Sequence, residues 1–149
     1  MMPPFIQEFV GVPFMEKGRS RAGVDCWGLV RLFYEERLGI ALPSYTENYA
    51  TTRDHEEIGA LVRREVLTDW REIPLVETYT GDVLVLRVTG EPMHIGIVIA
   101  PPMFLHSIRG AASCLERWDG VLWQHRIVGA YRNAQLANAQ EPVLAQVPT

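Results

Sequence analysis

The chain has 149 residues, of which 48% are hydrophobic and 21% charged, and its formal net charge is −4. This length predicts one domain with a short tail, and the balance excludes both an intrinsically disordered chain and a largely membrane-embedded one. The acidic balance argues against a nucleic-acid partner, and two cysteines are too few for a disulfide scaffold.

The start of the chain shows no targeting segment. It lacks a basic stretch followed by an apolar one, so we expect no signal peptide. The longest apolar stretch, about residues 95–105, is broken by Pro101 and Pro102 and is too short to span a bilayer. We therefore expect a protein that is made in a cytoplasm and stays there, or leaves it by a route without a cleaved signal, and that is not inserted in a membrane.

The first predicted element is a helix that follows an irregular, glycine- and proline-marked entry over residues 5–24. Asp25 is a suitable N-cap, and Gly39 is placed to end the helix. Apolar residues recur between them at the spacing of one buried helix face, namely Cys26, Leu29, Val30, Phe33, Tyr34 and Leu38.

A second helix is expected after a loop over residues 41–52. Asp54 and Glu57 have the spacing of a capping box, and an apolar stripe follows them. The segment Trp70–Pro74 is expected to close this helical unit.

From Gly81 the pattern changes to that of strands. Turns are expected at Glu91–Pro92 and at Pro101–Pro102. The predicted strands are Asp82–Val88, His94–Ile99, Met103–Ile108, Trp118–Gln124 and Ile127–Arg132. The sequence therefore predicts an α+β domain over residues 1–132, with helices on one side of an antiparallel sheet, and a docking or flexible tail over residues 133–149.

Cys26 is the candidate nucleophile. It lies at the start of the predicted helix, where unpaired N–H groups favour a thiolate, and Gly23 and Gly28 are expected to leave room for a substrate. The alternative is a small buried side chain on the helix face.

His94 and His106 are the candidate partners of Cys26, whereas His55 and His125 are expected to be surface or structural residues. A three-residue loop over residues 100–102 would place His94 and His106 on one face of a hairpin, and a two-residue loop would place them on opposite faces. Gly96 would leave space beside His94. The alternatives are two structural histidines, or a zinc site made with Cys26. We expect neither a metal nor a cofactor.

Four motifs follow one another along the chain, namely Gly11-Val12-Pro13-Phe14 with Gly18, Asp25-Cys26-Trp27-Gly28-Leu29-Val30, Gly81-Asp82-Val83 with His94-Ile95-Gly96-Ile97-Val98, and Phe104-Leu105-His106-Ser107. Over about residues 9–132 they resemble the NlpC family of papain-like cell-wall cysteine peptidases. Trp27 in the second motif, the Leu42-Pro43 pair and the closing Gly129–Arg132 segment look most like the phage-tail and gene-transfer-agent branch of that family.

The resemblance implies a papain-like fold and a mechanism. Cys26 would attack an amide carbonyl, His94 would shuttle the proton, and His106 would orient His94. The implied substrate is a peptidoglycan stem peptide, typically at the bond between D-glutamate and diaminopimelate. Implied partners are phage tail-tip or baseplate proteins, with the protein assembled in a bacterial cytoplasm and then carried in the virion tail.

Four further residues are expected to border the substrate, namely Asp25, Trp27, Phe14 and Gly96. Asp25 would cap the helix, bind a stem-peptide amine, or do both. Trp27 replaces the serine of the family motif, and Phe14 stands near a position where a tyrosine is frequent, so the bond that is cleaved stays open. The remaining alternatives are a tail assembly component with little activity and an acyltransferase using the same residues.

Overall fold

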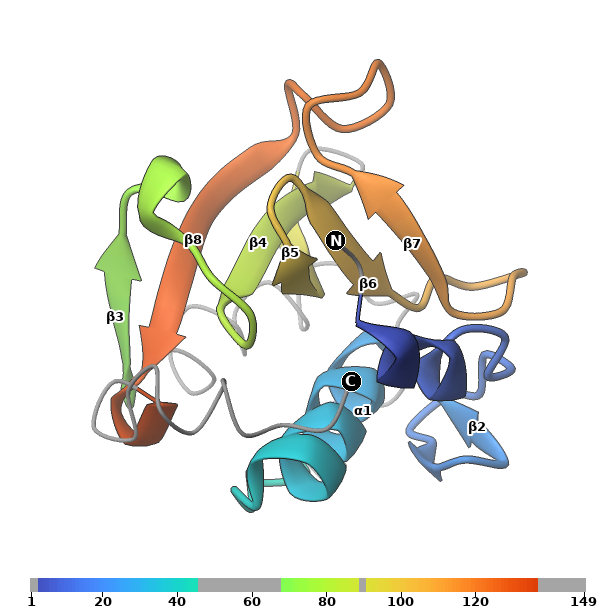
Figure 1. Cartoon of the computed structure of the whole chain (residues 1–149). Coiled ribbons are helices and arrows are strands. Elements are labelled where there is room, and N and C mark those ends of the chain that lie inside the picture. Colours follow the sequence, from blue (N-terminus) through green and yellow to red (C-terminus); the bar gives the residue numbers. More distant parts are fainter. Residues whose placement is uncertain (1–2, 46–67, 89–90, 137–149) are drawn as a thin grey trace.

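The computed structural model describes residues 3–45, 68–88 and 91–136 and contains one main helix and one main sheet (Figure 1). The helix is α1 (Cys26–Phe33), and the sheet is six-stranded and antiparallel in the order β3-β8-β4-β5-β6-β7. Its strands are β3 (Trp70–Ile73), β4 (Val83–Val88), β5 (Glu91–Ala100), β6 (Met103–His106), β7 (Cys114–Arg117) and β8 (Ile127–Asn133). The predicted α+β class is confirmed.

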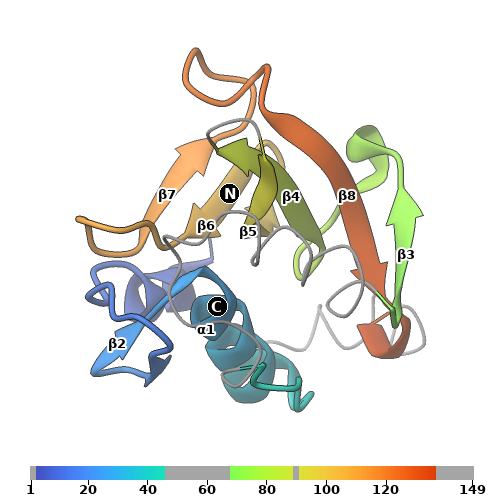
Figure 2. The same cartoon turned by 180° about the vertical axis from the view of Figure 1, so that it is seen from behind.

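Shorter elements flank the helix and the sheet. Figures 1 and 2 show α1 along one side of the sheet, with β2 beside it. These elements are the 3₁₀ helices η1 (Pro4–Phe9) and η4 (Leu75–Glu77), the hairpin strands β1 (Arg19–Ser20) and β2 (Gly23–Val24), and the π-helical turn η2 (Tyr34–Leu38). None of the helices in the described ranges is long and apolar enough to cross a membrane.

The helical segment that α1 and η2 form together begins and ends where the sequence predicts. A carboxylate oxygen of Asp25 accepts a hydrogen bond of 2.8 Å from the backbone N–H of Gly28, which satisfies one of the free donors of the first turn. The last turn widens into η2, and Gly39 follows with a φ of 66°, a left-handed conformation that glycine adopts without strain. The expected second helix from Asp54 lies outside the described residues.

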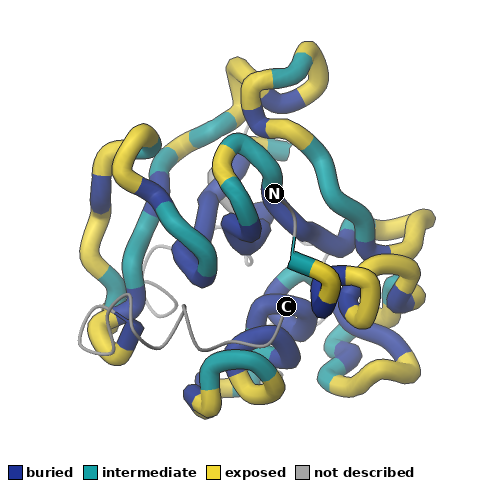
Figure 3. The backbone as a smooth tube through the Cα atoms, in the orientation of Figure 1, coloured by how far each residue is buried: buried dark blue, intermediate teal, exposed yellow. Residues whose placement is uncertain are grey.

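Two buried clusters hold the layers together, one on each face of the sheet. The strands alternate, so Val83 and Ile95 pack toward α1, whereas Leu84 and Phe104 pack on the opposite face with Trp123. Figure 3 shows the helix and the central strands as the buried part of the molecule. Because β4 and β5 are covered on both faces, they read as nearly continuous apolar runs.

Four of the predicted strands are confirmed as β4, β5, β6 and β8, with small changes at their ends. The predicted strand Trp118–Gln124 is wrong, because the chain there folds into turns: the N–H groups of Trp123 and Gln124 both donate to the carbonyl of Gly120. The strand lies earlier, at β7, and it pairs with β6.

Two other predicted segments also need correction. Glu91–Pro92 is not a turn but the start of β5, paired with the end of β4. Trp70–Ile73 does not simply close a helical unit, because it forms the edge strand β3 against β8. Neither segment is marked as a strand by its local pattern, so its conformation follows from its pairing with β4 or β8.

The hairpin between β5 and β6 combines a two-residue turn with a β-bulge. Ala100 pairs with Met103, which leaves only Pro101 and Pro102 in the turn. A register shift between Val98 and Ala100 then absorbs one residue of β5. The expectation that a two-residue turn would separate His94 and His106 is therefore wrong, because the bulge restores the register of a three-residue loop.

The described part of the C-terminal segment belongs to the domain. Asn133 is the last residue of β8 and is 3% exposed, and Leu136 is fully buried against Gly81. The predicted boundary at residue 132 therefore moves to at least Leu136, and residues 137–149 lie outside the described part.

Candidate active site

The structure brings His94 and His106 into direct contact. Nε2 of His94 lies 2.8 Å from Nδ1 of His106, a hydrogen-bonding distance, and both side chains are buried. His94 comes from the first half of β5 and His106 from the end of β6, so the bulged hairpin positions the pair. Of the two arrangements left open by the sequence, the structure has the one in which both histidines lie on the same face of the hairpin.

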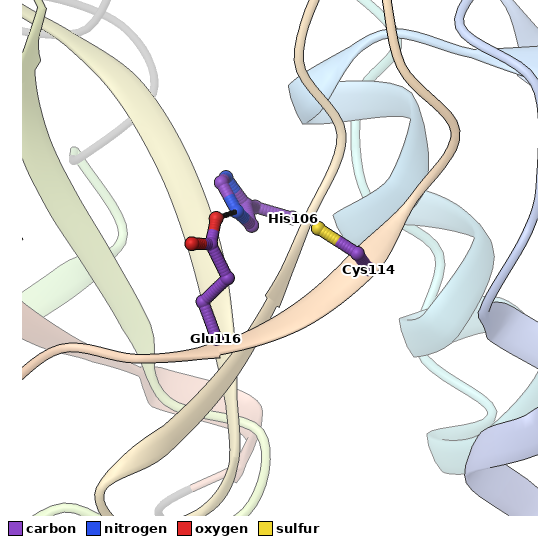
Figure 4. Close-up of side chains that lie close together, drawn as sticks. All are labelled: His106, Cys114 and Glu116. Carbon is purple, nitrogen blue, oxygen red and sulfur yellow. Dashed lines mark hydrogen bonds and ion pairs between the residues drawn. The ribbon is translucent and has the colours of Figure 1, made fainter. Parts of the chain in front are cut away.

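A carboxylate extends this pair. Oε2 of Glu116, on β7, lies 2.5 Å from Nε2 of His106 (Figure 4). The geometry follows from the register, because β7 lies beside β6 with Glu116 opposite Phe104 and Cys114 opposite His106. His94, His106 and Glu116 therefore form a continuous chain of two hydrogen bonds across three adjacent strands.

Aromatic rings cover the two histidines. Trp123 stacks on His94 with ring centroids 5.8 Å apart and an angle of 23° between the planes, and it meets His106 edge-on at 5.2 Å. Phe104 packs against His106 at 4.7 Å. These rings replace water around the imidazoles, which disfavours their charged forms.

The electrostatics follow from this burial. Burial, with His106 as a smaller cause, lowers the pKa of His94 from 6.5 to about 3. Burial also lowers the pKa of His106, and the hydrogen bond and charge of Glu116 oppose that shift. Both rings are therefore neutral at physiological pH, and a neutral imidazole is the form that can accept a proton.

Cys26 lies at the first position of α1 and is partly exposed. Burial and the charge of Asp25 raise the pKa of its thiol to about 12, although hydrogen bonding with the backbone at Ile95 and Trp27 acts in the opposite direction. The expectation that the helix start favours a thiolate is not supported, because the loss of water around the thiol disfavours its charged form.

Cys26 and the histidines approach the same part of β5. The backbone contact of the thiol is with Ile95, the residue that follows His94 in the chain. Hydrogen bonds join the two histidines to each other, but among the described residues none joins the thiol to either ring. Catalytic hydrogen bonds often tighten only when a substrate binds, so the lack of this bond is compatible with a resting site.

Asp25 holds the segment that carries Cys26. Its carboxylate is buried, caps Gly28 and forms an ion pair of 2.7 Å with the guanidinium of Arg19, while the backbone N–H of Lys17 donates to its second oxygen. The capping role predicted for Asp25 is confirmed. Its buried oxygens are occupied by this network, which leaves the other predicted role, binding a stem-peptide amine, without structural support.

Close backbone contacts and a serine complete this support. A Cβ atom added to Gly28 would lie 2.0 Å from the carbonyl oxygen of Gly18, so the two segments touch through their backbones. The hydroxyl of Ser107 donates to the carbonyl of Val24, which ties the end of β6 to the residue two positions before Cys26. The predicted role of Gly28 in leaving space for a substrate is therefore wrong, since backbone already fills that space.

Three of the predicted substrate-bordering residues have other contacts. Trp27 is buried, donates its indole N–H to the carbonyl of Pro43 and lines a cavity of about 380 Å³ with Trp70. Phe14 is partly buried beneath the guanidinium of Arg109. A Cβ atom on Gly96 would lie 2.6 Å from the Phe104 ring, so this ring occupies the space beside Gly96 that was expected for a substrate or the helix end.

One group of side chains has the composition of a metal site. Figure 4 shows His106, Cys114 and Glu116, whose potential ligand atoms lie within 4.8 Å of one another. Both ring nitrogens of His106 are already engaged, one by His94 and the other by Glu116. The geometry of these side chains therefore fits a hydrogen-bonded chain better than a metal site. The group also differs in its residues from the zinc site considered above, which consisted of Cys26, His94 and His106.

The sequence of the chain matches a known protein family over most of its length. Residues 11–132 match the model of the NlpC/P60 family, and this range includes Cys26, both paired histidines and Glu116. The chain belongs to the NlpC/P60 family.

Curated NlpC/P60 relatives agree with this assignment. The chain is 31% identical over 126 residues to a Haemophilus influenzae protein named probable endopeptidase, covering 80% of this chain and 68% of that protein. It is 26% identical over 125 residues to the Escherichia coli murein DD-endopeptidase MepS/murein LD-carboxypeptidase, covering 84% of this chain. The chain spans 57% of the length of MepS.

The fold of the chain also resembles that of solved NlpC/P60 structures. A solved NLP/P60-family structure from Staphylococcus aureus superposes with a TM-score of 0.61 at 22% identity, covering 87% of this chain and 40% of that chain. The expected papain-like α+β architecture of an NlpC/P60 domain is thereby confirmed.

Sequence reasoning misses two residues of this NlpC/P60 site, Glu116 and Trp123. Glu116 is hidden because the local pattern does not mark β7 as a strand, although the alternation of Cys114 and Glu116 places both on one face. Trp123 falls within the wrongly predicted strand, whereas a turn folds it over the histidines.

Proposed function

We propose that this protein is a cysteine peptidase that hydrolyses amide bonds in peptidoglycan stem peptides. The observation that carries the proposal is the hydrogen-bonded His94–His106 pair beside the β5 residue that Cys26 contacts. Membership of the NlpC/P60 family and similarity to murein endopeptidases support the substrate class.

The residues suggest a complete reaction. The Cys26 thiol gives its proton to the bare ring nitrogen of His94 as sulfur attacks the amide carbonyl, because burial makes a free thiolate costly. The C–N bond breaks, and the leaving amine takes the proton from His94. Water then adds to the thioester, with its proton passing through His94, and releases the acid and the Cys26 thiol. The backbone N–H of Cys26 is placed at the helix start to stabilise the oxyanion.

Digestion of purified sacculi tests this proposal. The wild-type protein should release stem-peptide fragments, identified by mass spectrometry together with the bond cleaved. Cys26→Ala should release none, because the nucleophile is gone, while Cys114→Ala, which removes the other thiol, should remain active. Equal release by Cys26→Ala and wild type would overturn the assignment, and transfer products in place of free acids would identify an acyltransferase.

We further propose, on the resemblance of Leu42-Pro43 and Gly129–Arg132 to the phage-tail branch, that the protein is assembled in a bacterial cytoplasm and carried by tail-tip or baseplate proteins. One observation favours docking in addition: Val121 and Leu122 are 87% and 65% exposed in the turn that carries Trp123. Co-purification of the chain with tail proteins from particles tests this setting. Particles with Cys26→Ala that assemble and infect normally would favour a structural role over a catalytic one.

A further inference from the structure

We infer that Glu116 is a positioning residue that fixes the proton positions on both histidines. The inference rests on the proposed function of Cys26 and His94, and it adds a fourth group to that site. It comes from the direction of the two hydrogen bonds that join Glu116, His106 and His94.

The direction of the first bond follows from the carboxylate. An ionised carboxylate has no proton to donate, so Nε2–H of His106 must donate to Oε2 of Glu116. A neutral imidazole carries one N–H, which leaves Nδ1 of His106 as an acceptor. The Glu116 carboxylate therefore sets the tautomer of His106.

The second bond then sets the tautomer of His94. Nε2 of His94 lies 2.8 Å from the bare Nδ1 of His106, so it must be the nitrogen that carries the proton. Nδ1 of His94 is consequently the unprotonated nitrogen and the one that takes a proton from a thiol. Without Glu116, the opposite tautomers would also be allowed, and they would leave His94 without a free acceptor at Nδ1.

The charge of Glu116 supplies a second effect. When His94 takes the thiol proton, it becomes an imidazolium buried under Trp123, where a positive charge is costly. The carboxylate stabilises that charge through the His106 ring. The side chain of Glu116 is 30% exposed, whereas that of His106 is fully buried, so Glu116 also links the chain to solvent.

The ring nitrogens can be observed directly. We would record ¹⁵N spectra of the imidazole rings in the wild-type protein and in Glu116→Gln, which keeps the shape and removes the charge. We expect both His94 and His106 as Nε2–H tautomers in the wild type, and a mixture of tautomers in Glu116→Gln. An Nδ1–H tautomer of His106 in the wild type, or unchanged tautomers in Glu116→Gln, would overturn the inference.

Thiol alkylation provides a functional readout that needs no peptidoglycan. The rate of iodoacetamide reaction at Cys26, followed by peptide mass spectrometry so that Cys114 is separate, reports transfer of the thiol proton. Glu116→Gln should lower this rate at neutral pH by at least about tenfold, less than the roughly hundredfold or more that a whole general base contributes, because Glu116 acts on the thiol only through the two histidines. Glu116→Asp, which keeps the charge, should restore part of it.

Asp119→Asn is the matched control, because Asp119 is an exposed carboxylate just beyond β7 that pairs with Arg117 and not with a histidine. It should leave both the tautomers and the alkylation rate unchanged. Equal alkylation in wild type and Glu116→Gln would overturn the positioning role even if the protein digested peptidoglycan. If Glu116→Gln changed the tautomers and the alkylation rate as expected, but the wild-type protein released no stem-peptide fragments from sacculi, the proposed substrate would be contradicted and the positioning role would stand.

Discussion

At the scale of single residues, burial dominates the chemistry of the site. Trp123 and Phe104 exclude water from the histidines, and the low pKa of His94 follows from that exclusion more than from a neighbouring charge. The same loss of water keeps Cys26 protonated. A protonated thiol beside a neutral imidazole requires the proton to move during the reaction, which makes the acceptor nitrogen of His94 decisive.

The first prediction concerns Trp123. Trp123→Ala should raise the pKa of His94 from about 3 toward 6.5, because removing the stacked ring lets water stabilise the imidazolium. An NMR titration of the ring resonances measures this shift, with circular dichroism to verify folding. Leu122→Ala, an exposed neighbour in the same turn, should leave the pKa unchanged. A His94 titration that is the same in all three proteins would contradict this account.

Some residues of the site can be identified from the sequence alone, and others cannot. Cys26, His94 and His106 stand in recognisable motifs, so the sequence alone identifies them as candidates. Glu116 escapes notice, because its role depends on a strand pairing with β6 that no local pattern specifies. The predictions of open space at Gly96 and Gly28 fail for the same reason: the ring or backbone that fills each space comes from a distant segment.

At the scale of elements, the start of α1 is held by close packing rather than by the helix alone. Gly18 and Gly28 bring two backbone segments together, and Asp25 with Arg19 fills the remaining polar space. This arrangement fixes where Cys26 emerges relative to β5.

The second prediction tests that packing. Gly28→Ala should lower the free energy of unfolding by about 1–3 kcal/mol, the usual cost of overpacking, because its Cβ would collide with the carbonyl oxygen of Gly18. Urea denaturation measures the change. In the control Gly120→Ala, the nearest atom to the new Cβ is the Arg117 carbonyl oxygen at 3.4 Å, an ordinary contact. Equal losses in the two variants would argue against the close approach.

Elements defined by local signals are predicted well, and those defined by partners are not. Helix α1 has a cap, a regular apolar face and a terminating glycine, which together fix its limits. Strands β3 and β7 are short outer strands of the sheet with few buried side chains, so their identity comes from hydrogen bonds to β8 and β6.

At the scale of the whole molecule, the buried histidines couple folding to pH. The pKa of His94 is about 3 in the folded protein and near 6.5 when the ring is exposed, so the folded state binds fewer protons between these values. Stability from this source is therefore complete above pH 6.5 and is lost as the pH falls toward 3. His106 contributes in the same direction.

The third prediction follows from this loss of stability at low pH. Between pH 7 and pH 5, the free energy of unfolding should fall more steeply in the wild type than in His94→Asn, which has no ring to protonate. The limiting difference in slope is about 1.4 kcal/mol per pH unit for one proton. Urea denaturation at several pH values measures both slopes, and parallel curves would show that burial of His94 carries no such cost.

The bulge in β5 has a consequence for how this site can vary. His94 and His106 are twelve positions apart, and the extra residue between Val98 and Ala100 is what lets them meet after a two-residue turn. Without the bulge, the same two-residue turn would pair His106 with Ile97 and place it on the opposite side of the sheet from His94, with every side chain of the site unchanged. The interval between the two histidines is thus as much a part of the site as the rings themselves, although the turn within it, at Pro101 and Pro102, lies toward the surface.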